Sequence, residues 1–180
     1  MANLYTEVQS QERKEVITYV TGDATWPVGD GQKLIAHICN DEGKWGSGFV
    51  VALSRRNRIA EDAYRLWHRN RENGGMPFAL GQVQMVNFDD GVWVANMIAQ
   101  LGVRHDMHAP RAVHYGALRA ALTKVADYAC RGLDAPSVHM PRIGCGLGGG
   151  DWRVVEGLIN DTLISRDVPV TVYDLPQEAA

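Results

Sequence analysis

The segment Met140–Trp152 (MPRIGCGLGGGDW) constrains the fold of this chain more than any other stretch. It joins an apolar run at Ser137–Ile143 to a stretch with helical spacing at Trp152–Leu163, and Gly144–Gly150, here called the glycine loop, holds five glycines. Glycine backbone adopts positive φ and approaches a ligand closely, and a helix that begins just beyond the loop points unpaired N–H groups back at it. The pattern predicts a strand, a loop that binds phosphate or diphosphate, and a helix.

The composition narrows the class of protein. A chain of 180 residues is long enough for one domain with a substantial core, and we assign residues 16–176 to it, with the polar residues 1–15 as a mobile arm. The net charge of −3 disfavours extended nucleic-acid binding. Three cysteines without metal-ligand spacing predict a reducing, cytoplasmic setting. No leader or membrane span is expected, and neither a metal, a cofactor nor a stable oligomer is predicted.

Hydrophobic periodicity predicts alternating strands and helices. Strands are expected at Val16–Val20, Leu34–Cys39, Gln82–Asn87, Val92–Ile98, Ser137–Ile143 and Val168–Asp174, and helices at Phe49–Arg56, Ile59–Glu72, Ala112–Leu133 and Asp151–Ser165. This alternation is typical of an α/β layer structure. The DDG turn at residues 89–91 adds a hairpin, so the sheet is expected to be mixed.

Three polar or glycine-rich segments follow predicted strands: Gly22-Asp23, Asn40–Gly48 and Gly144–Trp152. In open α/β sheets, ligands collect at the carboxyl ends of the strands. We therefore expect these segments to build a single cleft, with small residues at Gly46, Ser47 and Gly48 allowing a sugar to pack against backbone.

Each chemical motif has an alternative interpretation. Gly144-x-Gly146-x-x-Gly149 also matches the dinucleotide fingerprint, but it lies in the last βαβ unit, where half of a dinucleotide fold would be missing after it. Asp23 either accepts from an exocyclic amine or caps a turn.

The histidine and tryptophan side chains also have alternative interpretations, as structural residues or as residues that contact a ligand. His37, inside an apolar strand, is interpreted as a hydrogen-bonded core residue, and His105, His108 and His114 as surface residues without zinc spacing. Trp45 and Trp152 lie in the predicted ligand loops, where they would cover a sugar or a base.

Four blocks resemble the macrodomain family, the ADP-ribose-binding proteins with a three-layer α/β/α fold and a mixed, mostly parallel sheet. They are VTGDAT, LIAHICNDEGKWGSGFVVAL, MPRIGCGLGGGDW and VPVTVYDL, in that order along the chain. The chain is most similar to the branch of the terminal ADP-ribose protein glycohydrolase and its bacterial and phage relatives. The resemblance spans Ile17 to Leu175.

The resemblance implies a role for each segment. Asp23 would accept from the adenine amino group, the 40–49 loop would wrap the distal ribose, the glycine loop would hold the diphosphate, and residues 173–175 would border the adenine. The implied ligand-binding residues are Gly22, Asp23, Ala24, Asn40, Trp45, Gly46, Ser47, Gly48, Phe49, Ile143, Gly144, Cys145, Gly146, Leu147, Gly148, Gly149, Gly150, Asp151, Trp152, Tyr173 and Leu175.

One departure from the family pattern concerns catalysis. The animal glycohydrolase uses a lysine nucleophile and an aspartate, and the corresponding positions here are Gln100 and Gly148. A glutamine amide forms no Schiff base with an opened sugar, so a positioned water would have to attack. Asn40, Asp151 and Gln100, in that order, are the candidates to orient it, with Asp151 alternatively a helix cap.

The resemblance leaves three functions open. The lead hypothesis is hydrolysis of ADP-ribosyl esters on acidic side chains of modified proteins. The alternatives are a reader that binds ADP-ribose or its O-acyl derivative unchanged, and hydrolysis of ADP-ribose 1″-phosphate or of ADP-ribose attached to nucleic acid.

Overall fold

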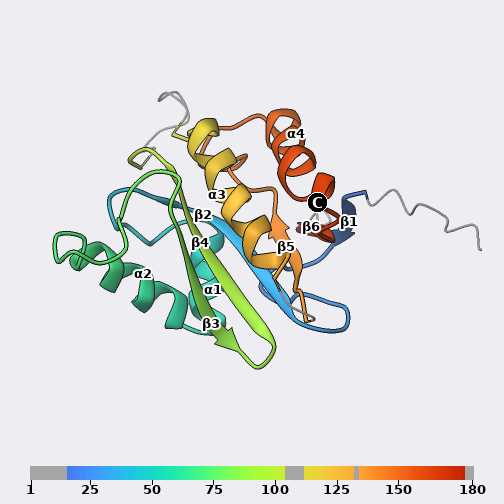
Figure 1. Cartoon of the computed structure of the whole chain (residues 1–180), viewed down its shortest axis with the longest axis horizontal. Helices are drawn as coiled ribbons and strands as arrows, with labels where there is room; N and C mark the ends of the chain where they lie inside the picture. The colour runs from blue at the N-terminus through green and yellow to red at the C-terminus, as the bar shows by residue number, and fades with distance from the viewer. Residues whose placement is uncertain (1–15, 104–111, 132–133, 177–180) are drawn as a thin grey trace, which may run out of the picture.

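A computed structural model of the protein describes residues 16–103, 112–131 and 134–176 (Figure 1). The predicted arm at residues 1–15, and His105 and His108 with their predicted surface positions, lie outside the described residues.

Six strands form one sheet in the order β1-β6-β5-β2-β4-β3. They are β1 (Thr18–Thr21), β2 (Lys33–Asn40), β3 (Val83–Asp89), β4 (Val92–Gln100), β5 (Ser137–Pro141) and β6 (Val170–Asp174). Neighbouring strands are parallel except β3 and β4, which form the antiparallel hairpin. The predicted mixed and mostly parallel sheet is confirmed.

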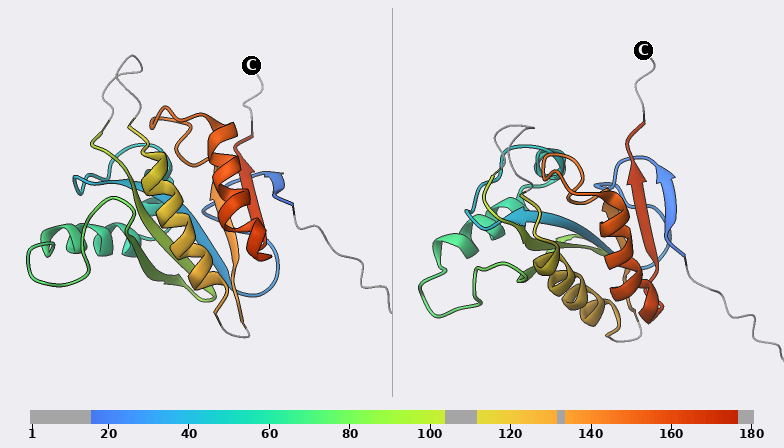
Figure 2. Two further views of the ribbon diagram at one scale, coloured as in Figure 1. Left: turned by 45° about the horizontal axis from the view of Figure 1, so that its top comes forward. Right: turned by 90° about the horizontal axis from the view of Figure 1, so that it is seen from above.

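Helices cover both faces of this sheet, which gives the three layers of an α/β/α fold (Figures 1 and 2). α1 (Phe49–Arg56) and α2 (Ile59–Arg69) lie on one face, and α3 (Tyr115–Ala129) and α4 (Trp152–Thr162) lie together on the other; a short 3-10 helix, η1 (Ile164–Arg166), follows α4. None of the helices in the described ranges has the length and apolarity needed to cross a membrane.

β2 lies between two hydrophobic cores. Leu34 and Ala36 belong to the core beneath α3 and α4, whereas Ile35 and Cys39 belong to the core beneath α1 and α2. A strand that is covered on both faces requires an apolar residue at nearly every position. This requirement explains the continuous apolar run from which the strand was predicted.

The longest predicted helix begins later than its periodicity indicates. α3 starts at Tyr115 rather than Ala112, because the backbone amide of Ala112 donates to the carbonyl of Gly148 in the glycine loop at 3.1 Å. His114 is exposed, as predicted, and its Nδ1 accepts from the amide of Ala117 at 3.0 Å. The start of α3 is therefore set by its contact with the glycine loop and by this cap.

Two buried histidines link neighbouring strands of the sheet. His37 is 1% exposed and its Nε2 lies 2.6 Å from Oδ1 of Asn96; Asn96 uses its Nδ2 as a donor to other groups, so the imidazole is the donor here. This pairing confirms the prediction of a core histidine. His139 is 2% exposed and its Nδ1 lies 2.9 Å from the hydroxyl of Tyr173. Burial lowers the pKa of His37 to about 4; burial, with the charge of Lys33, lowers the pKa of His139 to about 4.

These lowered pKa values predict acid sensitivity of the fold. An unfolded histidine titrates near its ordinary pKa of 6.5, so the unfolded state binds more protons than the native state between that value and about 4. The contribution of the two histidines to the free energy of unfolding should be fully present above pH 6.5 and should be lost as the pH falls toward 4. Urea unfolding at several pH values measures this dependence. His139→Gln should weaken the dependence, and an unchanged slope would contradict the assignment.

Candidate functional site

The carboxyl ends of five strands meet at one edge of the sheet. β1, β6, β5, β2 and β4 run parallel to one another, so the segments after them lie on the same side of the molecule (Figure 2). This edge carries the three segments that the sequence predicts to form a cleft.

Two connected cavities occupy this edge, with volumes of about 550 and 420 Å³. The larger one, here the main cavity, runs from Asp23 past α1 to the glycine loop. The smaller one, here the side cavity, lies beside the loop of residues 40–47. Both are lined by Ile38, Ser47, Val50, Gln100 and Leu147. A single elongated ligand can therefore occupy both.

The glycine loop turns its amides and its carbonyls in different directions. The Gly148 carbonyl accepts from Ala112, and the Gly144 carbonyl accepts from the amide of Gly150 at 2.8 Å. The amides of Gly146, Leu147 and Gly148 donate no hydrogen bond within the described ranges, and all three residues line the main cavity. Consecutive amides without acceptors form a binding site for an anion.

Close packing explains why glycine is needed in part of this loop. A Cβ on Gly148 would lie 2.8 Å from the Gly144 carbonyl oxygen. This distance is shorter than the contacts that real Cβ atoms make. Gly144 has φ +75°, a conformation that side chains disfavour. A Cβ on Gly146 would meet no atom within 4 Å. The glycines at 144 and 148 therefore shape the loop, whereas Gly146 leaves room for a ligand.

The helix end that faces the main cavity is that of α1, not the predicted α4. α1 begins after Gly48 with no side-chain cap and no acidic residue in its first turn, and Gly48, Phe49 and Val50 line the main cavity. α4 is capped by Asp151, whose carboxylate accepts from the amide of Arg153 at 2.9 Å. The unpaired N–H groups and positive dipole end of α1 add to the attraction for an anion.

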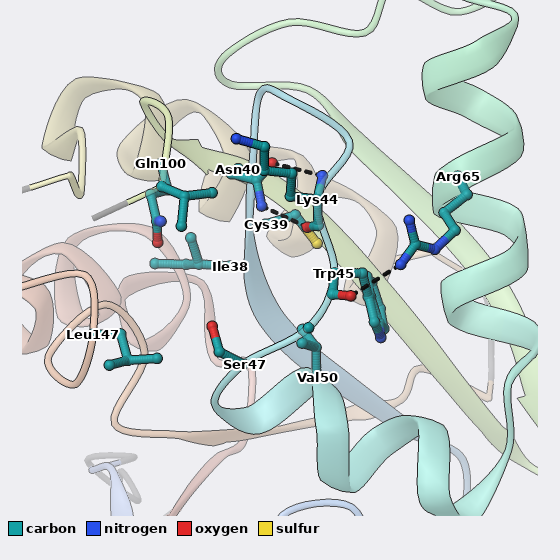
Figure 3. Close-up of a pocket in the computed structure, with 12 residues that line it drawn as sticks. Ile38, Cys39, Asn40, Lys44, Trp45, Ser47, Val50, Arg65, Gln100 and Leu147 are labelled. Atoms are coloured by element: carbon teal, nitrogen blue, oxygen red, sulfur yellow. Dashed lines mark hydrogen bonds between the residues drawn. The ribbon is translucent and has the colours of Figure 1, made fainter. Parts of the chain in front are cut away.

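The loop of residues 40–47 is held by Asn40. Its Oδ1 accepts from the amides of Glu42 and Lys44, both at 3.0 Å, and its Nδ2 donates to the Lys44 carbonyl at 2.6 Å (Figure 3). Tyr64 donates its hydroxyl hydrogen to the Asn40 carbonyl at 2.5 Å. Because these contacts use most of the amide of Asn40, the side chain acts mainly as a structural support for the loop.

Gln100, at the end of β4, lies where the two cavities join. Its Nε2 donates to the carbonyl of Gly102 at 3.0 Å, and its Oε1 accepts no hydrogen bond from any described residue. Figure 3 shows Gln100, Ile38 and Leu147 across the side cavity from Ser47. The amide oxygen of Gln100 is thus an acceptor available to a ligand or to a water molecule.

The far end of the main cavity is formed by Asp23 and Tyr173. One carboxylate oxygen of Asp23 accepts from the amide of Thr25 at 2.8 Å, so Asp23 does cap a turn; the residue nevertheless lines the cavity. The hydroxyl of Tyr173 accepts from the amide of Val28 at 3.0 Å. This bond ties the last strand to the segment that follows β1.

Most of the predicted site residues come together at this edge. Those that line a cavity are Gly22, Asp23, Ala24, Asn40, Trp45, Gly46, Ser47, Gly48, Phe49, Gln100, Ile143, Gly144, Gly146, Leu147, Gly148, Tyr173 and Leu175. The lining does not include Cys145, Gly149, Gly150, Asp151 or Trp152.

Trp152 packs elsewhere for a clear reason. Its indole makes an edge contact with Tyr19 of β1, with 6.3 Å between ring centroids, and the guanidinium of Arg142 lies 5.0 Å from its ring. Asp151 is committed to the cap of α4, and its own amide donates to the hydroxyl of Tyr115 at 2.8 Å. The predicted role of Asp151 at an attacking water gains no support from these contacts.

Other lining residues were not predicted. They are His37, Ile38, Cys39, Lys44, Val50, Ala52, Arg65, Val103, Pro141 and Arg142. The sequence held a signal for some of them: side chains alternate between the two faces of β2, and Lys44 lies between the predicted residues Asn40 and Trp45. Arg65 had no such signal, because only the packing of α2 brings it to the loop. Within the described residues no group of three or more His, Cys, Asp or Glu side chains is placed to hold a metal ion.

Comparison with solved structures identifies the class of this fold. A macrodomain protein from Streptomyces coelicolor is 52% identical, aligns over 88% of this chain and 99% of its own length, and superposes with a TM-score of 0.76. The chain belongs to the macrodomain family. No family model matches the sequence.

Two curated relatives are more distant. Chromodomain-helicase-DNA-binding protein 1-like from Mus musculus is 30% identical over 91% of this chain, which corresponds to only 18% of the mouse protein. ADP-ribose glycohydrolase OARD1 from Homo sapiens is 26% identical over 88% of this chain and 91% of its own length. The chain therefore matches a small part of the first relative and nearly all of the second.

The different packing of the glycines generates a prediction. Gly148→Ala should lower the free energy of unfolding by roughly 1–3 kcal/mol, since its Cβ would be forced against a backbone carbonyl. Gly146→Ala should leave that free energy nearly unchanged, because its Cβ would meet open space. Chemical denaturation of both variants measures the difference, and equal losses would show that the loop has a different conformation.

Proposed function

We propose that this macrodomain binds ADP-ribose along the two connected cavities. Adenine would lie near Asp23, the diphosphate between the glycine loop and the start of α1, and the distal ribose between Gln100 and the 40–47 loop. The observation that carries the proposal is the run of amides at residues 146–148, without acceptors among the described residues, beside the uncapped end of α1. The name of the human relative, an ADP-ribose glycohydrolase, supports this choice of ligand.

The distances between the loops support a diphosphate at this position. A Cβ on Gly48 would lie 3.5 Å from Cδ1 of Leu147, so the start of α1 and the glycine loop approach each other closely. Two phosphates between them would meet amide donors from both sides. Arg142 also lines the main cavity, but its guanidinium donates two hydrogen bonds to the carboxylate of Asp174, which offsets its charge.

Calorimetry with a ligand series tests the proposal. ADP-ribose should bind more tightly than ADP, and ADP more tightly than AMP, because each added group fills a further part of the connected cavities. NAD carries a nicotinamide on the distal ribose and should bind more weakly than ADP-ribose. Equal affinity for NAD and ADP-ribose would contradict the assignment and would favour a dinucleotide site.

A substitution at Asp23 tests the proposed contact with the adenine base. Asp23→Asn keeps one oxygen for the amide of Thr25 but replaces the other with an NH₂ donor. That donor would oppose the adenine amino group and would suit the carbonyl of hypoxanthine. The variant should therefore lose affinity for ADP-ribose by about 1.5–3 kcal/mol and gain preference for the inosine analogue. An unchanged base preference would reduce Asp23 to a turn residue.

A second candidate function is slow hydrolysis of ADP-ribosyl esters on modified proteins. The observation that favours hydrolysis is that Oε1 of Gln100 has no partner among the described residues, so this acceptor could hold a water molecule at the distal end of the ligand. The described residues that line the side cavity include no carboxylate and no imidazole. Any hydrolysis would rest on the positioned water and the backbone donors; without it, the protein is a reader of ADP-ribose.

Turnover of an ADP-ribosylated acceptor protein separates these two functions. Gln100→Ala should lower kcat by about tenfold, which is about 1.4 kcal/mol of barrier. Asp151→Ala should leave kcat unchanged and should destabilise the fold by about 1 kcal/mol, through loss of the α4 cap. No release of ADP-ribose by the wild-type protein, with ADP-ribose binding intact, would exclude ester hydrolysis and leave the reader.

A further inference from the structure

Glu61 is a buried carboxylate that lies outside both cavities. It occupies the first turn of α2 and is 8% exposed, on the side of the helix that also buries Ala60 and Tyr64. Oε2 accepts from the hydroxyl of Ser54 at 2.9 Å, and Oε1 accepts from Nε of Arg65 at 2.9 Å. Burial acts to raise the pKa of Glu61, but hydrogen bonds from Ser54 and Arg65 and the nearby arginines hold it below its usual value.

The first of these bonds belongs to a chain with a fixed direction. Nε1 of Trp45 donates to Oγ of Ser54 at 2.8 Å, and Ser54 donates its hydroxyl hydrogen to Glu61. An indole N–H only donates and an ionised carboxylate only accepts, so the serine hydroxyl must accept from one and donate to the other. The position of the Trp45 ring thus depends on an acceptor at residue 61.

The second bond reaches the same residue from the other side. Arg65 donates from Nε to Glu61 at 2.9 Å. It also donates from Nη2 to the backbone carbonyl of Trp45 at 2.9 Å (Figure 3). Both the ring and the carbonyl of Trp45 are therefore connected to the one carboxylate. The salt bridge between Glu61 and Arg65 lies within α2, so it orients the guanidinium that in turn holds the Trp45 carbonyl.

Trp45 is the buried anchor of an otherwise exposed segment. It is 8% exposed and packs against His37 and Tyr64, with 5.4 Å between ring centroids in each pair. Lys44 before it and Gly46 and Ser47 after it are exposed, and all of them line the side cavity. The conformation of this wall of the cavity depends on how Trp45 is held.

We propose that Glu61 is a positioning residue that sets the preference of the cleft for ADP-ribose over ADP. Through Ser54 and Arg65 it holds the Lys44–Ser47 wall in the shape that receives the distal ribose. The adenosine and diphosphate parts of the ligand would lie in the main cavity. The clamp, defined as Trp45, Ser54, Glu61 and Arg65, contributes no residue to the lining of that cavity, and of the wall only Ser47 lines it. This inference rests on the proposed function, because it concerns the distal ribose of the same ligand.

Glu61→Gln provides the most direct test. A glutamine amide has one acceptor oxygen where the clamp uses two, so either Ser54 or Arg65 loses its acceptor whichever way the amide is turned. The affinity for ADP-ribose should fall roughly tenfold, and the affinity for ADP should stay within about twofold. Calorimetry with both ligands measures this ratio. Tryptophan emission should also change in the unliganded protein, and this change should be absent in a Trp45→Phe background.

Asp62→Asn is the matched control. Asp62 is the other acidic residue in the first turn of α2 and is exposed, so its loss removes the same charge from the same helix end without disturbing the clamp. Both affinities should match those of the wild type. Ser54→Ala removes the bonds to the indole and to Oε2 of Glu61 but leaves Arg65 on Oε1, so it should shift the ratio in the same direction by a smaller factor.

The outcomes separate this inference from the proposed function. If Glu61→Gln weakens ADP-ribose and ADP equally, or changes neither, Glu61 has only a structural role and the inference is overturned. Should Glu61→Gln fail to fold, the Ser54→Ala ratio decides in the same way. If the wild-type protein itself does not prefer ADP-ribose over ADP, the proposed function fails before the variants are compared.

Discussion

The direction of the peptide groups in the glycine loop is the constraint on which the site depends. The carbonyls of Gly144 and Gly148 point into the protein, where they accept from Gly150 and Ala112. Between these two anchored carbonyls, the amides of Gly146, Leu147 and Gly148 are left without acceptors among the described residues. Glycine at position 148 is required by this arrangement, since a Cβ would meet the Gly144 carbonyl. The site for an anion is thus a consequence of how the loop is attached to α3.

The fold and the position of the cleft could be predicted because their signals are local. The apolar run of β2 reflects burial on both faces, and the parallel strands bring their carboxyl ends to one edge whatever the details of packing. Asp23, the 40–48 loop and the glycine loop each follow a strand, so their convergence follows from topology alone. The sequence was sufficient for this level of description.

Other features depend on packing between distant segments and left no local signal. The free helix end at the cavity belongs to α1, because Asp151 caps α4 and neither Asp151 nor Trp152 lines a cavity. Trp152 packs on Tyr19, which lies more than a hundred residues earlier in the chain. Glu61 reads as an ordinary surface carboxylate of an amphipathic helix until Ser54 and Arg65 are placed beside it.

A rigid distal wall and a lack of acid–base groups favour recognition over rapid chemistry. The clamp on Trp45 and the bonds of Asn40 shape the side cavity before a ligand arrives, which lowers the ordering cost of binding. Contacts of this kind are equally strong before and during a reaction, and uniform binding does not raise kcat. Only a group that interacts more strongly in the transition state would do so, and among the described residues that line this cavity the amide oxygen of Gln100 and the hydroxyl of Ser47 are acceptors without a partner. The proposed choice between reader and hydrolase in this macrodomain therefore depends on what these two side chains hold at the distal end of the ligand.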